Sequence, residues 1–277
     1  MALSIQPYHE PGAFDVLAGE WSALLRRSPS NTIFITPEFQ RTWWRCLGEG
    51  DLLILTMRDE AEGLVGLAPL FAPPRADGQR ALSLIGCTEV ADYLDFIVAR
   101  GWEEPVYTAL MDELAAREAE WDLLDLCNIH QDSPTLTWLP ALAAARGWTA
   151  TIEKEDVCPI VRLPATWDEY LERLDGKDRH ELRRKLRRAE GMTPPVRWYI
   201  VGPEHNLEEE CEEFLILMAA STPEKAAFLT PQMCEFFRQL MRVAYDAGWL
   251  QLAFLTVGEQ RAAAYLNFVY NNRVLVY

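Results

Sequence analysis

The sequence predicts an α+β protein built as two units in tandem, each a mixed, mainly antiparallel sheet flanked by helices. The prediction depends on one plan that occurs twice, in which two helical segments precede apolar strands separated by polar turns. The strand region reads DLLILTMRDEAEGLVGLAPLFAPPRADGQRALSLIG at 51–86 and GWLQLAFLTVGEQRAAAYLNFVYNNRVLVY at 248–277. Such internal similarity indicates a duplicated unit. We expect a first unit at residues 1–164 and a second, incomplete unit at 165–277.

Composition places the chain among ordinary globular proteins. It has 277 residues, 49% of them hydrophobic, and ten Trp, which is enough for substantial cores. No run reaches the roughly 18 apolar residues of a membrane span, and the N-terminus MALSIQPYHEPGAF has no signal-peptide pattern. We therefore expect a cytoplasmic protein without a transmembrane segment.

Cysteine and histidine usage argues against a metal site. The six cysteines are widely spaced without a C-x-x-C pair, and we expect them to be reduced core residues; they stand at positions 46, 87, 127, 158, 211 and 234. Four scattered histidines assemble neither a zinc site nor a Ser/His/Asp arrangement. P-loop, dinucleotide-binding and hydrolase motifs are absent from the sequence. We predict no metal cofactor.

The elements of the first unit follow from hydrophobic periodicity and from helix start and stop signals. We expect helices at 13–25, 36–48, 105–117 and 139–145, the last with Pro140 in its first turn. We expect strands at 52–57, 64–71, 81–86, 92–98, 122–128 and 148–164. Trp43 lies in the second helix, where it is either a core residue or part of a substrate pocket.

Acidic residues in the predicted strand 92–98 need a reason. Tyr93 and Asp95 alternate there with Leu94, Phe96 and Val98. One interpretation is that Asp92 and Asp95 lie at a solvated strand start. The other is a pocket in which a carboxylate acts as general base or binds a substrate amine.

The second unit opens on a segment whose charge opposes that of the whole chain. Thr166 and Glu169 form a capping box, and Gly191 ends the predicted helix. Leu171, Leu174, Leu182, Leu186 and Ala189 share one arc if the helix runs unbroken through Gly176, and we expect that arc to be buried. Beyond it the sequence predicts strand 196–201, helices 207–218 and 230–248, and the second meander.

Two basic rows lie away from the apolar arc. The first contains Arg179, Arg183 and Arg187, and the second Lys177, Arg184 and Arg188. Seven Lys/Arg against two acids fall between 177 and 188 in a chain of net charge -16. Like charges at i, i+4 cost a helix about 0.2 to 0.5 kcal/mol per pair. Either an external anion binds here, or the rows are neutralised by glutamates between 208 and 213 of the same chain.

These segments together resemble a known family. The order of two helices and an antiparallel meander resembles the GCN5-related N-acetyltransferase (GNAT) fold. Two such units resemble the bacterial CelD/BioF2-like acetyltransferases and, more distantly, the FemAB-like (FemABX) peptidyltransferases. The residues that carry the resemblance are ADYLDFIV in the first unit, and TWDEYLERLDGKDRHELRRKLRRAEG and GWLQLAFLTVGEQRAAAYLNFVY in the second. Members of the family continue beyond the equivalent of Tyr277, and we therefore expect a C-terminal truncation.

The resemblance implies an acyltransferase that uses acetyl-CoA or another acyl-CoA. A substrate amine or hydroxyl attacks the thioester directly while a general base takes the proton. By this resemblance Asp92 and Asp95 are candidates for catalysis. Candidates for substrate binding are Tyr93 and Trp43 and, for an anionic group, Lys177, Arg179, Arg183, Arg184 and Arg187. The acceptor belongs to bacterial envelope or exopolysaccharide synthesis in this interpretation.

Two other functions remain open from the sequence. One is a Fem-type transferase that uses an aminoacyl-tRNA, for which the basic helix is the support and the net charge of -16 the objection. The other is a non-catalytic protein that uses the basic helix 177–188 to bind an acidic partner or an anionic membrane surface. The same fold serves many functions, so the fold alone does not decide among them.

Overall fold

The structure is a computed structural model that describes residues 3–87 and 90–277. The chain forms two compact units. The first contains 1–153, 230–247 and 270–273, and the second contains 154–229, 248–269 and 274–277. The predicted α+β fold with a mixed sheet, flanking helices and a second antiparallel sheet is confirmed. Residues 230–247 belong to the first unit although they follow residues 154–229 in the chain.

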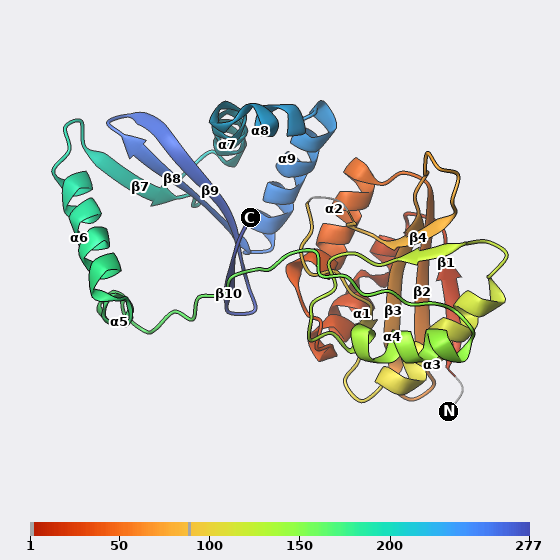
Figure 1. Cartoon of the computed structure of the whole chain (residues 1–277). Coiled ribbons are helices and arrows are strands. Elements are labelled where there is room, and N and C mark those ends of the chain that lie inside the picture. Colours follow the sequence, from red (N-terminus) through yellow and green to blue (C-terminus); the bar gives the residue numbers. More distant parts are fainter. Residues whose placement is uncertain (1–2, 88–89) are drawn as a thin grey trace. The chain divides into compact units, whose positions relative to one another are not determined.

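The first unit is built on a mixed sheet in the order β1-β2-β3-β4-β6, with β5 paired to β3 (Figure 1). Its strands are β1 (Ser4–Tyr8), β2 (Asp51–Asp59), β3 (Gly63–Ala72), β4 (Ala81–Leu84), β5 (Ile97–Val98) and β6 (Leu123–Asp125). Its helices are α1 (Ala13–Arg27), a 3-10 turn η1 (Ile33–Ile35), α2 (Pro37–Leu47), α3 (Glu103–Ala116), α4 (Pro134–Ala145) and α9 (Pro231–Asp246).

Helices cover both faces of this sheet, as the sequence of β3 requires. β3 is apolar along its length, and all its residues between the two ends are buried. Phe71 contacts Trp43 of α2 at 5.3 Å between ring centroids. A Cβ added to Gly66 would come within 2.5 Å of Val106 in α3. Since residues 66 and 71 point to opposite faces of a strand, α2 and α3 lie on opposite sides of the sheet.

The second unit holds an antiparallel sheet in the order β10-β9-β8-β7. Its strands are β7 (Val196–Ile200), β8 (Leu250–Val257), β9 (Gln260–Tyr270) and β10 (Arg273–Val276), and its helices are α5 (Trp167–Arg173), α6 (Gly176–Glu190), α7 (Leu207–Ser221) and α8 (Pro223–Phe228). Phe254 and Leu252 are buried, whereas Trp198, Leu255 and Tyr265 stay 71%, 38% and 62% exposed. One face of this sheet is therefore apolar and open within the unit.

Three predictions about elements of the first unit are wrong. Residues 92–98 are not one strand, because Tyr93 adopts a left-handed conformation (φ 58°) and only Ile97–Val98 pair with β3. The expected strand 148–164 is irregular and pairs with no strand among the described residues. Ile160, within this segment, is 76% exposed. Helix α4 starts five residues earlier than expected, because Ser133 caps it at Thr135 N and Pro134 opens it, so Pro140 is internal.

The expected unbroken helix from 166 to 190 is also wrong. Leu174 is extended (φ -71°, ψ 148°), and the Asp175 carboxylate accepts a hydrogen bond from Asp178 N at 2.8 Å, which starts a new helix. The break separates Leu171, which is 4% exposed in α5, from the apolar residues of α6. No residue of α6 is buried, and Leu186 is 40% exposed. The predicted arc is therefore not a buried face.

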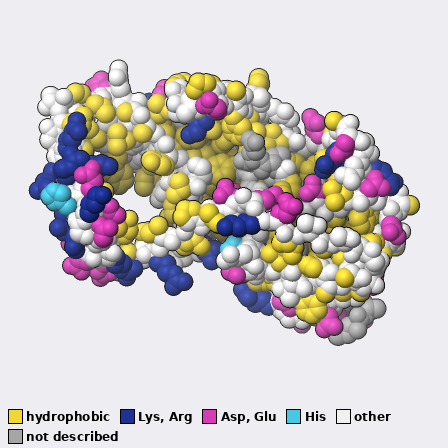
Figure 2. Space-filling view, viewed as in Figure 1, with side chains coloured by type: hydrophobic (Ala, Val, Ile, Leu, Met, Phe, Trp, Pro, Cys, Tyr) yellow, Lys and Arg dark blue, Asp and Glu magenta, His cyan; other side chains and the backbone are white. Residues whose placement is uncertain are grey.

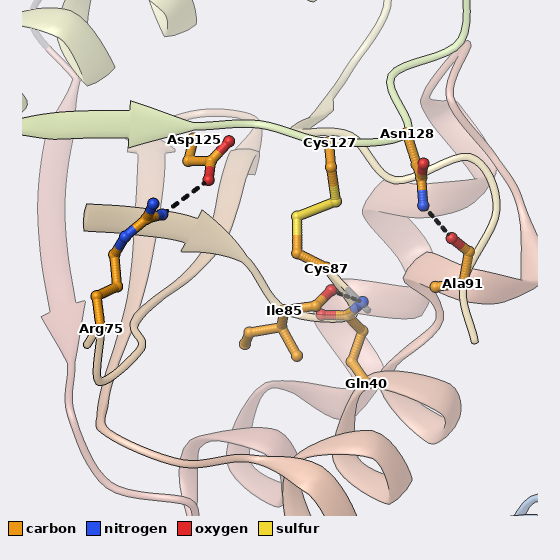
Figure 3. The surroundings of a disulfide bond; sticks show 8 residues. All are labelled: Gln40, Arg75, Ile85, Cys87, Ala91, Asp125, Cys127 and Asn128. Carbon is orange, nitrogen blue, oxygen red and sulfur yellow. Dashed lines mark hydrogen bonds and ion pairs between the residues drawn. A yellow bond between two sulfur atoms is a disulfide. The ribbon is translucent and has the colours of Figure 1, made fainter. Parts of the chain in front are cut away.

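The expectation that all six cysteines are reduced is wrong for one pair. Cys87 and Cys127 form a disulfide with 5.9 Å between their Cα atoms (Figure 3). β4 and β6 are parallel neighbours that pair Ser83 with Asp125, so the residues that follow them converge. Gln40 holds the backbone just before Cys87, because its side-chain amide donates hydrogen bonds of 2.8 Å to the carbonyls of Phe34 and Ile85.

Candidate functional site

The basic helix α6 is stabilised by residues at its own two ends. The Asp175 cap stands at its N-terminus, and Arg187 and Arg188 stand in the last turn, where they complement the helix dipole. Lys177, Arg183, Arg184 and Arg187 are exposed and Arg179 is half-buried. We call Arg179, Arg183 and Arg187 the arginine ridge. Figure 2 shows Lys and Arg side chains gathered along α6.

The arginine ridge has no acidic partner within the chain as described. Among residues 3–87 and 90–277, no ion pair joins Lys177 or a ridge arginine to a carboxylate. Within the described residues, the ion-paired basic side chains of α6 share one acid, because Glu181 pairs with Lys185 Nζ at 3.6 Å and accepts from Arg184 at 2.7 and 2.9 Å. That hydrogen bond holds the pKa of Glu181 at about 2. The structure thus leaves the ridge available to an external anion.

One of the glutamates expected to neutralise the ridge, Glu210, has another role. Glu210 of α7 is 5% exposed, and its carboxylate accepts from Arg261 Nη2 at 2.6 Å and from Tyr199 Oη at 2.8 Å. Arg261 Nε also donates to Tyr199 Oη at 2.8 Å and its guanidinium lies 5.3 Å from the Phe254 ring centre. This cluster fastens α7 to strands β7, β8 and β9.

Sequence reasoning missed the cluster around Glu210, although one signal was present. Glu210 falls three residues after Leu207 and four before Phe214, both of which belong to the buried stripe of α7. A charged residue at a stripe position needs a buried partner, whereas the other glutamates of the run fit an exposed face. The position of Glu210 within the helical pattern of buried residues indicates its role better than the run of glutamates does.

Asp95, a predicted catalytic residue, lies in a closed network of hydrogen bonds in the first unit. Its carboxylate is 3% exposed and accepts from Ser30 Oγ, Ser133 Oγ and Thr135 Oγ1, each at 2.5 Å, and from Phe96 N at 2.9 Å. Tyr107 Oη in turn donates to Thr135 at 2.7 Å. Burial raises the pKa of Asp95, opposed by these hydrogen bonds. The network ties the loop before α2 to the start of α4.

The other predicted residues of the first unit differ from Asp95 in their surroundings. Asp92 is exposed, and Tyr93 is half-buried with its ring 5.3 Å from that of His130. Trp43 is 1% exposed and packs in the core against Phe71, which leaves it no surface for a substrate. The predicted residues therefore form two sets, Asp92, Tyr93 and Asp95 in the first unit and the basic residues of α6 in the second.

The described residues offer neither a metal site nor a membrane span. No group of three or more His, Cys, Asp or Glu among them has the arrangement of metal ligands. No helix within the described residues is long and apolar enough to cross a bilayer. The group best suited to an anionic ligand is the arginine ridge, since its guanidinium groups are charged, accessible and without carboxylate partners.

Comparison with known proteins agrees with the fold. Residues 176–277 match the model of the acetyltransferase (GNAT) domain family. Among solved structures, the chain is similar to the crystal structure of FemX, with a TM-score of 0.56 and 16% identity over 90% of this chain and 57% of FemX. It is also similar to a conserved protein of unknown function from Bacteroides thetaiotaomicron VPI-5482, with a TM-score of 0.50 and 13% identity over 95% of this chain and 75% of the other.

These comparisons show which class of fold the chain has. The fold is GNAT-like, as predicted, and the family match begins at the first residue of α6. The chain spans a little over half the length of FemX. No curated protein matches.

Proposed function

We propose that the chain is an acyltransferase that moves an acetyl or other acyl group from acyl-CoA to an amine or hydroxyl acceptor. The match of residues 176–277 to the GNAT acetyltransferase domain carries this proposal. The acyl thioester supplies an activated carbonyl when it is bound. The ridge arginines on α6 suit its phosphate groups, because they are cationic and make no ion pair among the described residues.

Each unit carries its own candidates for the proposed chemistry. In the second unit the ridge arginines are the candidates for holding an anionic group. In the first unit a carboxylate is the candidate for taking the proton of the attacking amine or hydroxyl. Asp92 suits the second task better than Asp95, because Asp92 is exposed whereas Asp95 already accepts four hydrogen bonds from its own fold. Tyr93, beside Asp92, is the candidate for a substrate contact. The acceptor we propose is a precursor in bacterial envelope or exopolysaccharide synthesis in the cytoplasm.

Binding of CoA tests the role of the ridge. The variant Arg179→Gln/Arg183→Gln/Arg187→Gln is expected to weaken CoA binding at least about tenfold, about 1.4 kcal/mol, because three charge-assisted hydrogen bonds are lost. Isothermal titration calorimetry with CoA measures it. The matched control Arg26→Gln/Arg162→Gln/Arg197→Gln removes the same charge from exposed positions and should bind as the parent does. Equal binding by the ridge variant and the parent would remove the ridge from the proposal.

A Fem-type reaction with an aminoacyl-tRNA is the second candidate. Its support is the similarity to FemX over 90% of the chain, together with the basic surface of α6. Phosphate contacts make such binding strongly dependent on salt. We expect a steep fall in tRNA binding between 50 and about 200 mM salt if this candidate is right. Absence of tRNA binding at low salt would exclude it.

A further inference from the structure

Helix α6 combines its cations with apolar side chains that remain accessible. At about 100° per residue, Leu182, Leu186 and Ala189 point in nearly one direction, and the arginine ridge runs beside them. Leu182 and Ala189 are half-buried, and Leu186 is 40% exposed. A helix of a globular protein usually buries such a stripe. In α6 no residue is buried.

Further exposed apolar groups stand at both ends of α6. Trp167 of the preceding helix α5 is 52% exposed and stacks on Tyr170, with 5.4 Å between ring centroids. Met192, two residues after α6, is 41% exposed. Tryptophan with one polar and one apolar edge is enriched at membrane–water interfaces. The cationic helix is thus flanked by side chains that favour such an interface.

We propose that α6 is a peripheral docking helix for anionic phospholipid membranes. The stripe of Leu182, Leu186 and Ala189 enters the boundary between headgroups and acyl chains, and the ridge arginines contact lipid phosphates. A strongly charged helix of low mean hydropathy with a narrow apolar stripe is typical of helices that lie in this boundary. Charge complementarity supports the occupant, since seven Lys/Arg stand against two acids between 177 and 188.

The apolar stripe decides between a membrane and a nucleic acid. Both attract a basic helix through phosphate groups. Contacts with an RNA backbone satisfy the arginines but leave Leu182 and Leu186 in water, and single-stranded RNA is usually held by aromatic stacking. α6 contains no Phe, Tyr or Trp, and the aromatic rings of Trp167 and Tyr170 in α5 stack on each other. A membrane surface satisfies both the arginines and the leucines.

Sedimentation with vesicles tests the inference. The full chain should bind vesicles of phosphatidylglycerol and phosphatidylcholine and should not bind phosphatidylcholine alone. At about 1 kcal/mol per cation, the variant Arg179→Gln/Arg183→Gln/Arg187→Gln should lower the partition coefficient about 100-fold. The variant Leu182→Ser/Leu186→Ser, which keeps every charge, should lower it about tenfold. The control Arg26→Gln/Arg162→Gln/Arg197→Gln should bind as the parent does.

The leucine variant separates this inference from the proposed function. CoA binding by Leu182→Ser/Leu186→Ser should equal that of the parent, because the ridge is intact, while its vesicle binding falls. Because neither leucine is buried, circular dichroism should show both variants folded. The inference would be overturned if the leucine variant bound vesicles as strongly as the parent does. It would also be overturned if the parent bound neutral vesicles as strongly as anionic ones. Binding of tRNA that displaces the chain from vesicles and survives the leucine substitutions would overturn it in favour of a nucleic-acid surface.

Discussion

Replacing Phe236 by Ala is expected to lower the free energy of unfolding of the first unit by about 3 to 5 kcal/mol. Phe236 belongs to α9, is fully buried, and packs edge-on against Phe39 of α2 with 6.0 Å between ring centroids. Truncation therefore leaves a cavity between two helices that are far apart in the sequence. Urea denaturation followed by tryptophan fluorescence measures the loss.

Amide hydrogen exchange shows where the loss falls. In Phe236→Ala the amides of α2 should lose protection, because α9 packs on that helix. The matched variant Phe254→Ala empties a buried position in the sheet of the second unit, where Phe254 stacks on Tyr199 at 5.5 Å. It should leave α2 protected. A loss below about 1 kcal/mol with unchanged exchange in α2 would contradict the assignment of α9 to the first unit.

The elements that the sequence predicts well are those with a local signal. Thr36 and Thr230 are each followed by proline, and each threonine hydroxyl accepts a hydrogen bond of 3.2 Å from an amide three residues on. Both helices precede an antiparallel meander, and both meanders have a register shift near the end of their first strand, at 57–58 and 255–256. Caps and alternation depend on neighbours in the chain, so they can be read before the fold is known.

The start of α4 at Ser133 and the break before α6 at Asp175 depend on local caps that the sequence analysis missed, whereas the other wrong predictions concern features that depend on distant residues. α9 has its own apolar stripe, but the sequence does not say that Phe39 receives it. Cys87 and Cys127 are 40 residues apart and meet only because β4 and β6 are parallel neighbours. Apolar residues at 148–164 are compatible with a strand, yet a strand also needs a partner with free backbone groups. Such contacts come from topology, which periodicity does not contain.

The candidate site residues also divide into those that local sequence predicts and those whose surroundings depend on distant residues. The arginine ridge is local, because residues four apart on a helix share a face whatever surrounds them. The environment of Asp95 is not local, because its donors Ser30, Ser133 and Thr135 come from segments 65, 38 and 40 residues away. An acid in an apolar segment therefore signals that partners exist without saying whether they are hydroxyl groups of the fold or a substrate.

Replacing Asp95 by Ala is expected to lower the free energy of unfolding by about 3 kcal/mol, because two buried hydroxyls, the half-buried hydroxyl of Ser30 and the Phe96 amide lose their acceptor together. Replacement by Asn keeps the shape and one acceptor oxygen, so a smaller loss of about 1 kcal/mol is expected. Chemical denaturation of both variants at one pH measures the difference. Equal losses for Ala and Asn would show that the negative charge, and not the acceptor geometry, holds the network.

The pH dependence of this network tests whether burial or hydrogen bonding controls Asp95. Burial raises the pKa of Asp95 above the ordinary 3.8, so the folded chain holds the proton more tightly than the unfolded chain does. The extra stability that the bound proton gives the folded chain is then fully present below pH 3.8. It is lost as the pH rises through the raised pKa of Asp95 in the folded chain. Relative to Asp95→Asn, which does not titrate there, the parent should become less stable as the pH rises from about 4. A parent that gains stability over this range, measured by urea denaturation at each pH, would show that the hydrogen bonds outweigh burial and that Asp95 is an ordinary buried carboxylate anion.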